Sequence, residues 1–180
     1  VIDNFDLYIA KIKKVIPKDS SAGEISVRLG ATWIPQEDIQ RFVIELLTPS
    51  SYAAGRIRVR YTAINGDWFI ENKSSDYGNV KADSTYGTKR ASAYRIIEDT
   101  LNLRDVRIFD YVLDEHGNRK AVFNHKETTA AQAKQEVIKQ AFQDWIWKDP
   151  ERRNRLGRSY NDTFNSVRPR EYDGSHITFG

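Results

Sequence analysis

The stretch RIRVRYTAINGDWFIENK, residues 56–73, decides how this chain folds. Its two halves alternate apolar with polar residues, as a β-strand with one buried face does. Asn65-Gly66 lies between the halves and is the strongest short signal for a hairpin turn. A two-residue turn there sets the register, with Tyr61 opposite Ile70, Ala63 opposite Trp68 and Arg60 opposite Glu71. These residues therefore predict an antiparallel β-hairpin.

Segments with helical periodicity flank this hairpin. Apolar residues recur at three- and four-residue intervals over 5–16, over 35–47 and over roughly 90–102, which predicts three amphipathic helices. Pro35 suits the first position of the second helix, because its fixed φ matches a helical start. The polar residues 74–90 carry little regular pattern, so we expect a loop there.

Toward the C-terminus, the sequence predicts a second hairpin and two more helices. VRIFDYVL (106–113) and RKAVF (119–123) have the composition of strands, with a turn at 115–118. Thr129 and Gln132 form a capping box for a long helix that runs to about Lys148. Asp149-Pro150 begins the last helix, which ends near Asn165.

Helices and hairpins interleave along the chain. This order predicts an α+β fold in which antiparallel β-hairpins are packed by amphipathic helices. We expect a single domain over residues 1–165 and a linker over residues 166–180. The long helix has two apolar rows, of which one ends on Trp145, so we expect Trp145 in the core and Trp147 exposed.

The composition fits a soluble domain with a substantial core. Apolar residues make up 39% of the chain, charged residues 29%, and the mean hydropathy is −0.64. No apolar run approaches the roughly 20 residues of a membrane-spanning helix. The absence of cysteine excludes a disulfide framework and a thiolate zinc site, and it favours a cytoplasmic location.

The motifs that imitate catalytic sites have simpler structural interpretations. Asp114-Glu115-His116-Gly117 resembles a helicase acidic box, but the chain lacks the GxxxxGK[ST] loop that such a box requires, so we predict a hairpin turn. Asp67, Glu71 and Lys73 share strand parity, and metal-dependent nucleases place their catalytic residues in this way. Because the two acids lie so close in sequence, solvent-facing charges are favoured, and a metal-dependent nuclease is a minor alternative. We expect no catalytic, cofactor-binding or metal-binding residue in this chain.

Basic residues gather near the C-terminal end. The net charge is only +3, but residues 151–170 hold six arginines against Glu151 and Asp162. On the last helix, Leu156, Tyr160 and Phe164 mark the expected buried side, and Arg153 falls inside the same arc. The candidates for phosphate contacts are therefore Arg152, Arg155, Arg158, Arg168 and Arg170. A solvated helix face is the alternative interpretation.

A second candidate strip lies on the first hairpin. Arg56, Arg58 and Arg60 alternate with apolar residues, which predicts a row of arginines on one strand face. Such a row suits a phosphate backbone. It suits equally well an ion-pair network with Glu71 and neighbouring acids.

Three long segments resemble one known family. They are KDSSAGEISVRLGATWIPQEDIQRF (18–42), STYGTKRASAYRIIEDTLNLRDVRIFDYV (84–112) and QAKQEVIKQAFQDWIWKDPERRNRLGRSYNDTFNSVRPREYDGSHITF (132–179). They are similar to the central region of very large bacterial mobile-element proteins, which join an adenine-specific DNA methyltransferase to a Swi/Snf-type superfamily-two helicase. These segments are not catalytic signatures, so the resemblance implies a context and no site residue.

This resemblance implies what surrounds the chain. The parent protein would use ATP, Mg²⁺ and S-adenosylmethionine, and it would restrict, modify or mobilise DNA. The chain starts at Val1 and contains no methionine, and we expect it to be a piece of a longer polypeptide. We therefore expect a non-catalytic accessory domain that couples the flanking methyltransferase and helicase and binds DNA without sequence preference. A purely structural interdomain or protein-docking module is the alternative.

Overall fold

The computed structural model describes residues 9, 11 and 18–165. It forms two compact units: one contains residues 27–149, and the other combines the chain before Val27 with the chain after Asp149. The domain expected over 1–165 thus contains both units. The linker expected over 166–180 lies outside the described residues, and so does the helix expected over 5–16, apart from residues 9 and 11.

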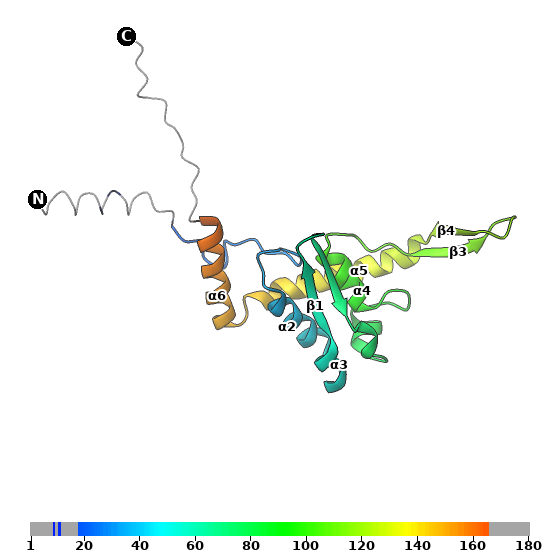
Figure 1. The fold of residues 1–180 in the computed structure, drawn as a ribbon, viewed down its shortest axis with the longest axis horizontal. Coiled ribbons are helices and arrows are strands. Elements are labelled where there is room, and N and C mark those ends of the chain that lie inside the picture. The colour runs from blue at the N-terminus through cyan, green and yellow to red at the C-terminus, as the bar shows by residue number, and fades with distance from the viewer. Residues whose placement is uncertain (1–8, 10, 12–17, 166–180) are drawn as a thin grey trace, which may run out of the picture. The chain divides into compact units, whose positions relative to one another are not determined.

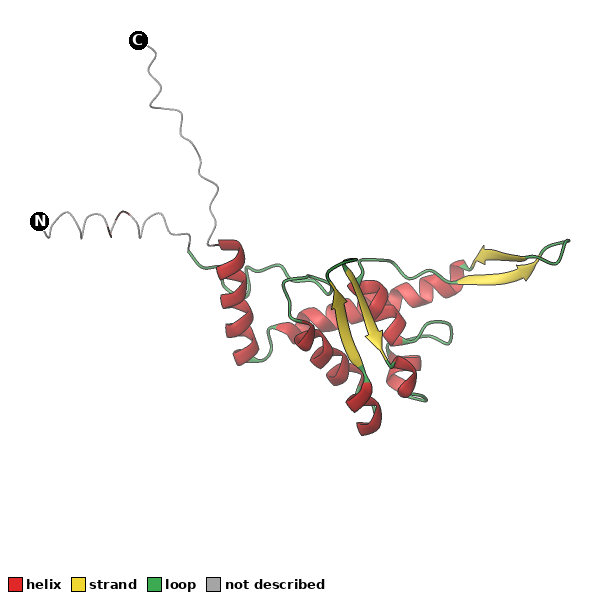
Figure 2. Cartoon of the chain, viewed as in Figure 1, coloured by secondary structure: helices red, strands yellow, loops and turns green. Residues whose placement is uncertain are grey.

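The α+β class is confirmed, with two separate two-stranded antiparallel sheets among helices (Figures 1 and 2). The larger unit contains α2 (Gln36–Leu47), α3 (Ser51–Arg56), β1 (Arg58–Thr62), β2 (Asp67–Glu71), η1 (Lys73–Ser75), η2 (Lys81–Thr85), α4 (Ala93–Leu101), β3 (Phe109–Leu113), β4 (Arg119–Phe123) and α5 (His125–Ile146). The smaller unit contains α6 (Pro150–Tyr160) and η3 (Asn161–Asn165). Within the described residues, none of these helices has the length and apolar character to cross a bilayer.

The core of the larger unit forms where α2 meets α5. The predicted stripe of α2 is buried, with Phe42 and Val43 at its centre. On α5 the row of Ile138, Phe142 and Ile146 is fully buried, and the Phe42 and Phe142 rings meet edge to face at 5.0 Å. Burial of such side chains contributes about 1.5–3 kcal/mol each.

The two tryptophans near the end of α5 are both partly exposed. Trp145 stacks on Phe142 and lies tilted against Phe42, and its Nε1 donates to Glu45 Oε2 at 2.5 Å. It therefore lies beside the core and not within it, where we expected it. Trp147 is half-buried, so the prediction that it is exposed is wrong.

The first hairpin forms, but its predicted register is wrong by two residues. Tyr61 pairs with Trp68 and Arg60 with Phe69, because the loop contains the four residues 63–66. A two-residue type I′ turn needs positive φ at both central residues. Gly66 alone has it here (φ 70°), and its amide donates to Thr62 O across the longer loop. A shift of two residues preserves which side chains face the core.

Side chains of the neighbouring helices close both edges of this hairpin. Gln36 and Gln40 of α2 accept hydrogen bonds from β1 amides, at 3.3 Å each. On the other edge, Glu98 and Asn102 at the end of α4 accept from β2 amides at 2.9 and 2.8 Å. Unpaired strand edges invite association with other chains, and here polar helix residues occupy the exposed amides.

The polar segment 74–90 is not the simple loop that we expected. It contains the end of η1 and all of η2, and Asp76 anchors it. The buried Asp76 carboxylate accepts from Tyr94 Oη and from Asn79 Nδ2, both at 2.6 Å. Burial and the neighbouring Asp76 raise the pKa of Tyr94 well above its ordinary value.

The second hairpin forms as predicted and projects beyond the start of α5 as an arm (Figure 1). Its root is fixed to the unit: Arg90 Nη1 and Asn124 Nδ2 donate to the Asp110 carboxylate at 2.7 and 2.8 Å. These two donors lower the pKa of Asp110. Every residue of the arm from Tyr111 to Phe123 is exposed.

The capping box predicted at Thr129 is wrong. α5 begins five residues earlier than this box implies, at His125, because Asn124 accepts from the Glu127 amide at 3.0 Å and caps the helix directly after β4. Thr129 lies inside the helix, where its hydroxyl donates to His125 O. The helices expected over 35–47, over roughly 90–102 and from Pro150 are confirmed, although α4 begins at Ala93 because Ser92 caps it.

Candidate nucleic-acid interface

The last helix, α6, begins at Pro150 as predicted and carries four arginines against Glu151. Its buried side is rotated from the one that we expected. Arg152 is only 4% exposed and lies one helical turn before the buried Leu156, while Arg153 is exposed. The prediction of a solvent-facing Arg152 is therefore wrong. The buried row of α6 consists of Arg152 and Leu156, one helical turn apart, whereas Phe164 is 50% exposed.

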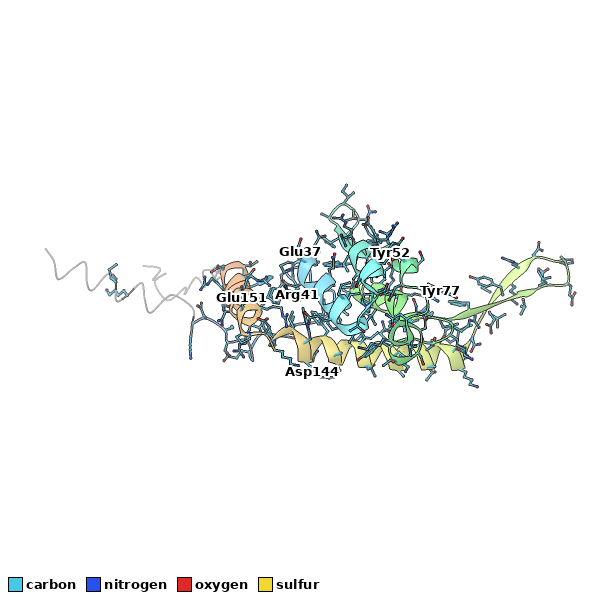
Figure 3. The ribbon with its side chains drawn as sticks, turned by 90° about the horizontal axis from the view of Figure 1, so that it is seen from below. Glu37, Arg41, Tyr52, Tyr77, Asp144 and Glu151 are labelled. Carbon is cyan, nitrogen blue, oxygen red and sulfur yellow. The ribbon has the colours of Figure 1, made fainter. Side chains whose placement is uncertain are left out.

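Exposed residues of α6 and of the following η3 line an open groove of about 490 Å³. Two of the predicted arginines, Arg155 and Arg158, lie there together. The other lining residues are polar as well: Glu151, Asn154, Ser159, Asp162 and Thr163. Figure 3 shows Glu151 at the start of this helix. The groove is thus one continuous polar stripe.

The sequence contained the signal for this stripe, although we searched it only for arginines. Positions 151, 154, 155, 158, 159 and 162 follow the intervals of three and four residues that define one helix face. Asn154, Ser159 and Thr163 are additional hydrogen-bonding residues that the charge-based search missed.

Asparagine side chains fix α6 within the smaller unit. Asn161 exchanges two hydrogen bonds with the Ser20 backbone, at 2.7 and 3.0 Å, and Asn165 donates to Ser20 Oγ at 3.1 Å. In the same segment, the amide and hydroxyl of Ser21 donate to Glu24 and lower the pKa of that carboxyl. The residues 18–26 therefore hold the end of the helix in place.

Of the predicted arginines outside α6, those that the structure describes, Arg56, Arg58 and Arg60, belong to the larger unit. Arg168 and Arg170 lie outside the described residues. Arg56 belongs to α3, where its guanidinium lies 5.1 Å from the Tyr52 ring, and Arg58 donates to Ile57 O. Arg60 forms an ion pair with Glu71 at 3.3 Å. The predicted row of three on one strand face is therefore wrong, because Arg56 belongs to a helix. The pairing of Arg60 with Glu71 agrees with the alternative of an ion pair.

The residues of the nuclease alternative are also separated. Lys73 lies in η1 and forms an ion pair with Glu98 of α4 at 2.9 Å, while Glu71 pairs with Arg60. In the described part of the chain, no three acidic or histidine side chains cluster in a way that could hold a metal ion.

The acidic-box imitation is a hairpin turn, as predicted. Asp114 accepts from the amides of His116 and Asn118 at 2.9 and 2.8 Å, and these bonds lower its pKa. Gly117 supplies the positive φ of 75° that the turn requires. These residues are exposed at the tip of the arm.

Comparisons with known proteins add one finding. No curated protein and no solved structure matches the chain. One family model matches residues 28–166, which include nearly all of the larger unit together with α6. The chain therefore belongs to the family described as "Domain of unknown function (DUF8437)".

Proposed function

We propose that this chain is a non-catalytic accessory domain that binds duplex DNA through the polar stripe of α6. In this proposal it couples a DNA methyltransferase to an ATP-dependent helicase on the same polypeptide, and those neighbours use S-adenosylmethionine, ATP and Mg²⁺. The observation that carries the proposal is the groove in which Arg155 and Arg158 lie beside Asn154, Ser159 and Thr163.

The chemistry of the stripe suits phosphate rather than bases. Arginine, serine, threonine and asparagine side chains are the groups that commonly contact phosphate oxygens in protein–DNA complexes. Glu151 and Asp162 line the same groove and offset its charge. We therefore expect modest affinity without base preference. Arg153 on the same helix, and Arg168 and Arg170 further along the sequence, are additional positive charges.

The proposal predicts a salt-dependent interaction that depends on the groove. If Arg155 and Arg158 neutralise one phosphate each, duplex affinity falls about tenfold between roughly 50 and 200 mM salt. Fluorescence anisotropy with a labelled duplex, using the full 180-residue chain, measures this dependence. Arg155→Glu/Arg158→Glu should weaken binding and flatten the salt dependence.

Arg41 provides the matched control, since it is an exposed arginine on α2, outside the groove (Figure 3). Arg41→Glu changes the net charge in the same direction and should leave the affinity within about twofold of that of the unsubstituted chain. An equal loss in the Arg41 variant, or no binding by the unsubstituted chain at about 50 mM salt, refutes the DNA-binding proposal.

A second candidate function, protein docking, is favoured by the β3–β4 arm. Phe109, Tyr111 and Leu113 share one face with Phe123, and Tyr111 and Leu113 are 70% and 71% exposed. A lone two-stranded hairpin is at best marginally stable in water. Asp114 and Glu115 near the tip offset Arg119 and Lys120, which favours a protein surface over phosphate.

Hydrogen exchange tests the docking candidate. In a longer polypeptide that contains the flanking domains, arm amides between residues 110 and 123 should exchange at least about tenfold more slowly than in the 180-residue chain. Tyr111→Ser/Leu113→Ser should remove this protection, because the apolar contact is lost. Identical exchange of the arm in both polypeptides contradicts docking by this face.

A further inference from the structure

A pocket of about 290 Å³ in the larger unit has no role in the functions proposed above. It lies where the loop after α4 meets α5 and the segment around Arg28. Its lining residues are Arg28, Leu29, Thr100, Leu103, Arg104, Asp105, Gln135, Lys139 and Gln143. The volume lies near the lower end of small-molecule sites, which span roughly 300–1,000 Å³.

The charges that line this pocket are mainly positive. Arg28, Arg104 and Lys139 face a single lining acid, Asp105. Lys139 is paired with Glu136 at 2.8 Å. Across the described part of the chain, neither the Arg28 nor the Arg104 guanidinium has a hydrogen bond or an ion pair within 4.0 Å.

Asp99 is an acid near this site, and its charge interacts with the charges of Arg95 and Arg104. Burial raises the pKa of Asp99 more than these arginines lower it. An anion that reaches both the Arg28 and the Arg104 guanidinium would gain planar, charge-assisted hydrogen bonds.

The inner polar groups of the pocket are already used within the protein. Gln135 is 1% exposed, and its Nε2 donates to Thr100 Oγ1 and to Arg104 O at 3.0 and 2.8 Å. Its Oε1 accepts from the Val106 amide at 3.3 Å, and Thr100 Oγ1 donates to Ile96 O. A ligand would therefore find apolar contact at Leu29 and Leu103. The basic side chains of the pocket would offer it positive charge.

Leu103 adds a further unusual feature at this site. Its φ is 57°, in the left-handed region, and its side chain is 60% exposed. It follows the end of α4, where the Arg104 amide donates to Asp99 O at 2.8 Å. Glycine is the usual residue at such a helix end, so the leucine keeps a strained backbone and an exposed apolar side chain at the pocket.

We propose that this pocket binds a small organic anion, whose phosphate or carboxylate group contacts Arg28 and Arg104 and whose apolar body packs on Leu29 and Leu103. Lys139 supplies additional positive charge. The site is independent of the α6 groove, since the two share no residue.

Four probes separate the charge from the apolar body. Phenyl phosphate and benzoate carry both, inorganic phosphate carries only the charge, and benzyl alcohol carries only the body. Titration of the full chain, followed by amide NMR shifts of residues 28–29 and 103–105, should give saturable binding of phenyl phosphate or benzoate. Whichever of the two binds more tightly identifies the anionic group, and it should bind about tenfold more tightly than inorganic phosphate and benzyl alcohol.

Two variants test the contributions of Arg104 and Leu103 to binding, and Arg41→Ala serves as the control. Arg104→Ala should weaken binding of the preferred probe about tenfold or more, while Arg41→Ala should not change it. Leu103→Gly should weaken binding severalfold while the thermal midpoint stays equal or rises, because glycine relieves the left-handed backbone.

Three outcomes overturn the proposal. They are the absence of saturable shifts with both organic anions up to about 10 mM, equal affinity for inorganic phosphate and phenyl phosphate, and unchanged binding in Arg104→Ala. None of these outcomes bears on DNA binding by α6, which is measured with different variants.

Discussion

Gly87 illustrates how a single residue is fixed by its neighbours. A Cβ at this position would lie 2.1 Å from the Ala82 carbonyl oxygen and 2.8 Å from the Ala93 nitrogen. Both of those atoms belong to the backbone, which does not move aside as a flexible side chain would. Gly87 thus allows the end of η2 to pack closely against the start of α4.

Two glycine substitutions should have opposite effects on stability. Gly87→Ala should lower the free energy of unfolding by about 2 kcal/mol or more, because backbone must shift to admit the methyl group. Gly55 lies in α3 with no atom within 4 Å of a built Cβ, so Gly55→Ala should raise the free energy by about 0.5–1 kcal/mol. Urea unfolding measures both, and a harmless Gly87→Ala would contradict the packing argument.

At the scale of elements, local sequence predicted the type of each long segment and missed some of its boundaries. Alternation identified both hairpins, and the stripe around Phe42 identified α2. The register of the first hairpin depended on whether Asn65 adopts positive φ, which its identity allows without requiring. The start of α5 depended on Asn124, which also donates to Asp110 in the preceding hairpin. A competing cap was therefore selected by a contact outside the helix.

Substitutions at the two candidate N-cap residues test where α5 begins. Asn124→Ala should lower the free energy of unfolding by about 1–2 kcal/mol, because α5 loses its N-cap and the arm loses the Asp110 contact. Thr129→Ala should change it by no more than about 0.5 kcal/mol, since Thr129 is exposed within the helix. Chemical denaturation followed by circular dichroism compares them. The reverse order of effects would restore the capping box at Thr129.

For the whole molecule, the division into two units predicts independent folding of the larger one. Residues 27–149 contain α2, both hairpins, α4 and α5, together with the buried Phe42 and Phe142. A polypeptide of these residues should unfold in one cooperative transition, within about 8 °C of the midpoint of the full chain. Calorimetry tests this, and a broad, non-cooperative transition would show that the larger unit depends on the remaining chain.

The candidate sites divide in the same way between what sequence shows and what it hides. The stripe of α6 could be predicted, because its residues lie on α6 and on the directly following η3, and periodicity places most of them on one face. Even there, the burial of Arg152 was missed, since the buried side was inferred from Leu156, Tyr160 and Phe164 alone. The pocket of Arg28, Arg104 and Lys139 joins three distant segments, and no spacing in the sequence connects them.

By itself, the sequence determined the fold class, the identity of the long elements and the lack of familiar catalytic motifs, because these depend on local periodicity and on short spacings. Only the tertiary structure decided the hairpin register, the cap of α5, the partners of Arg60 and Lys73, and the gathering of cations beside Leu103. Those features depend on contacts between residues far apart in the chain, where competing local choices differ by only about 1 kcal/mol and packing selects among them.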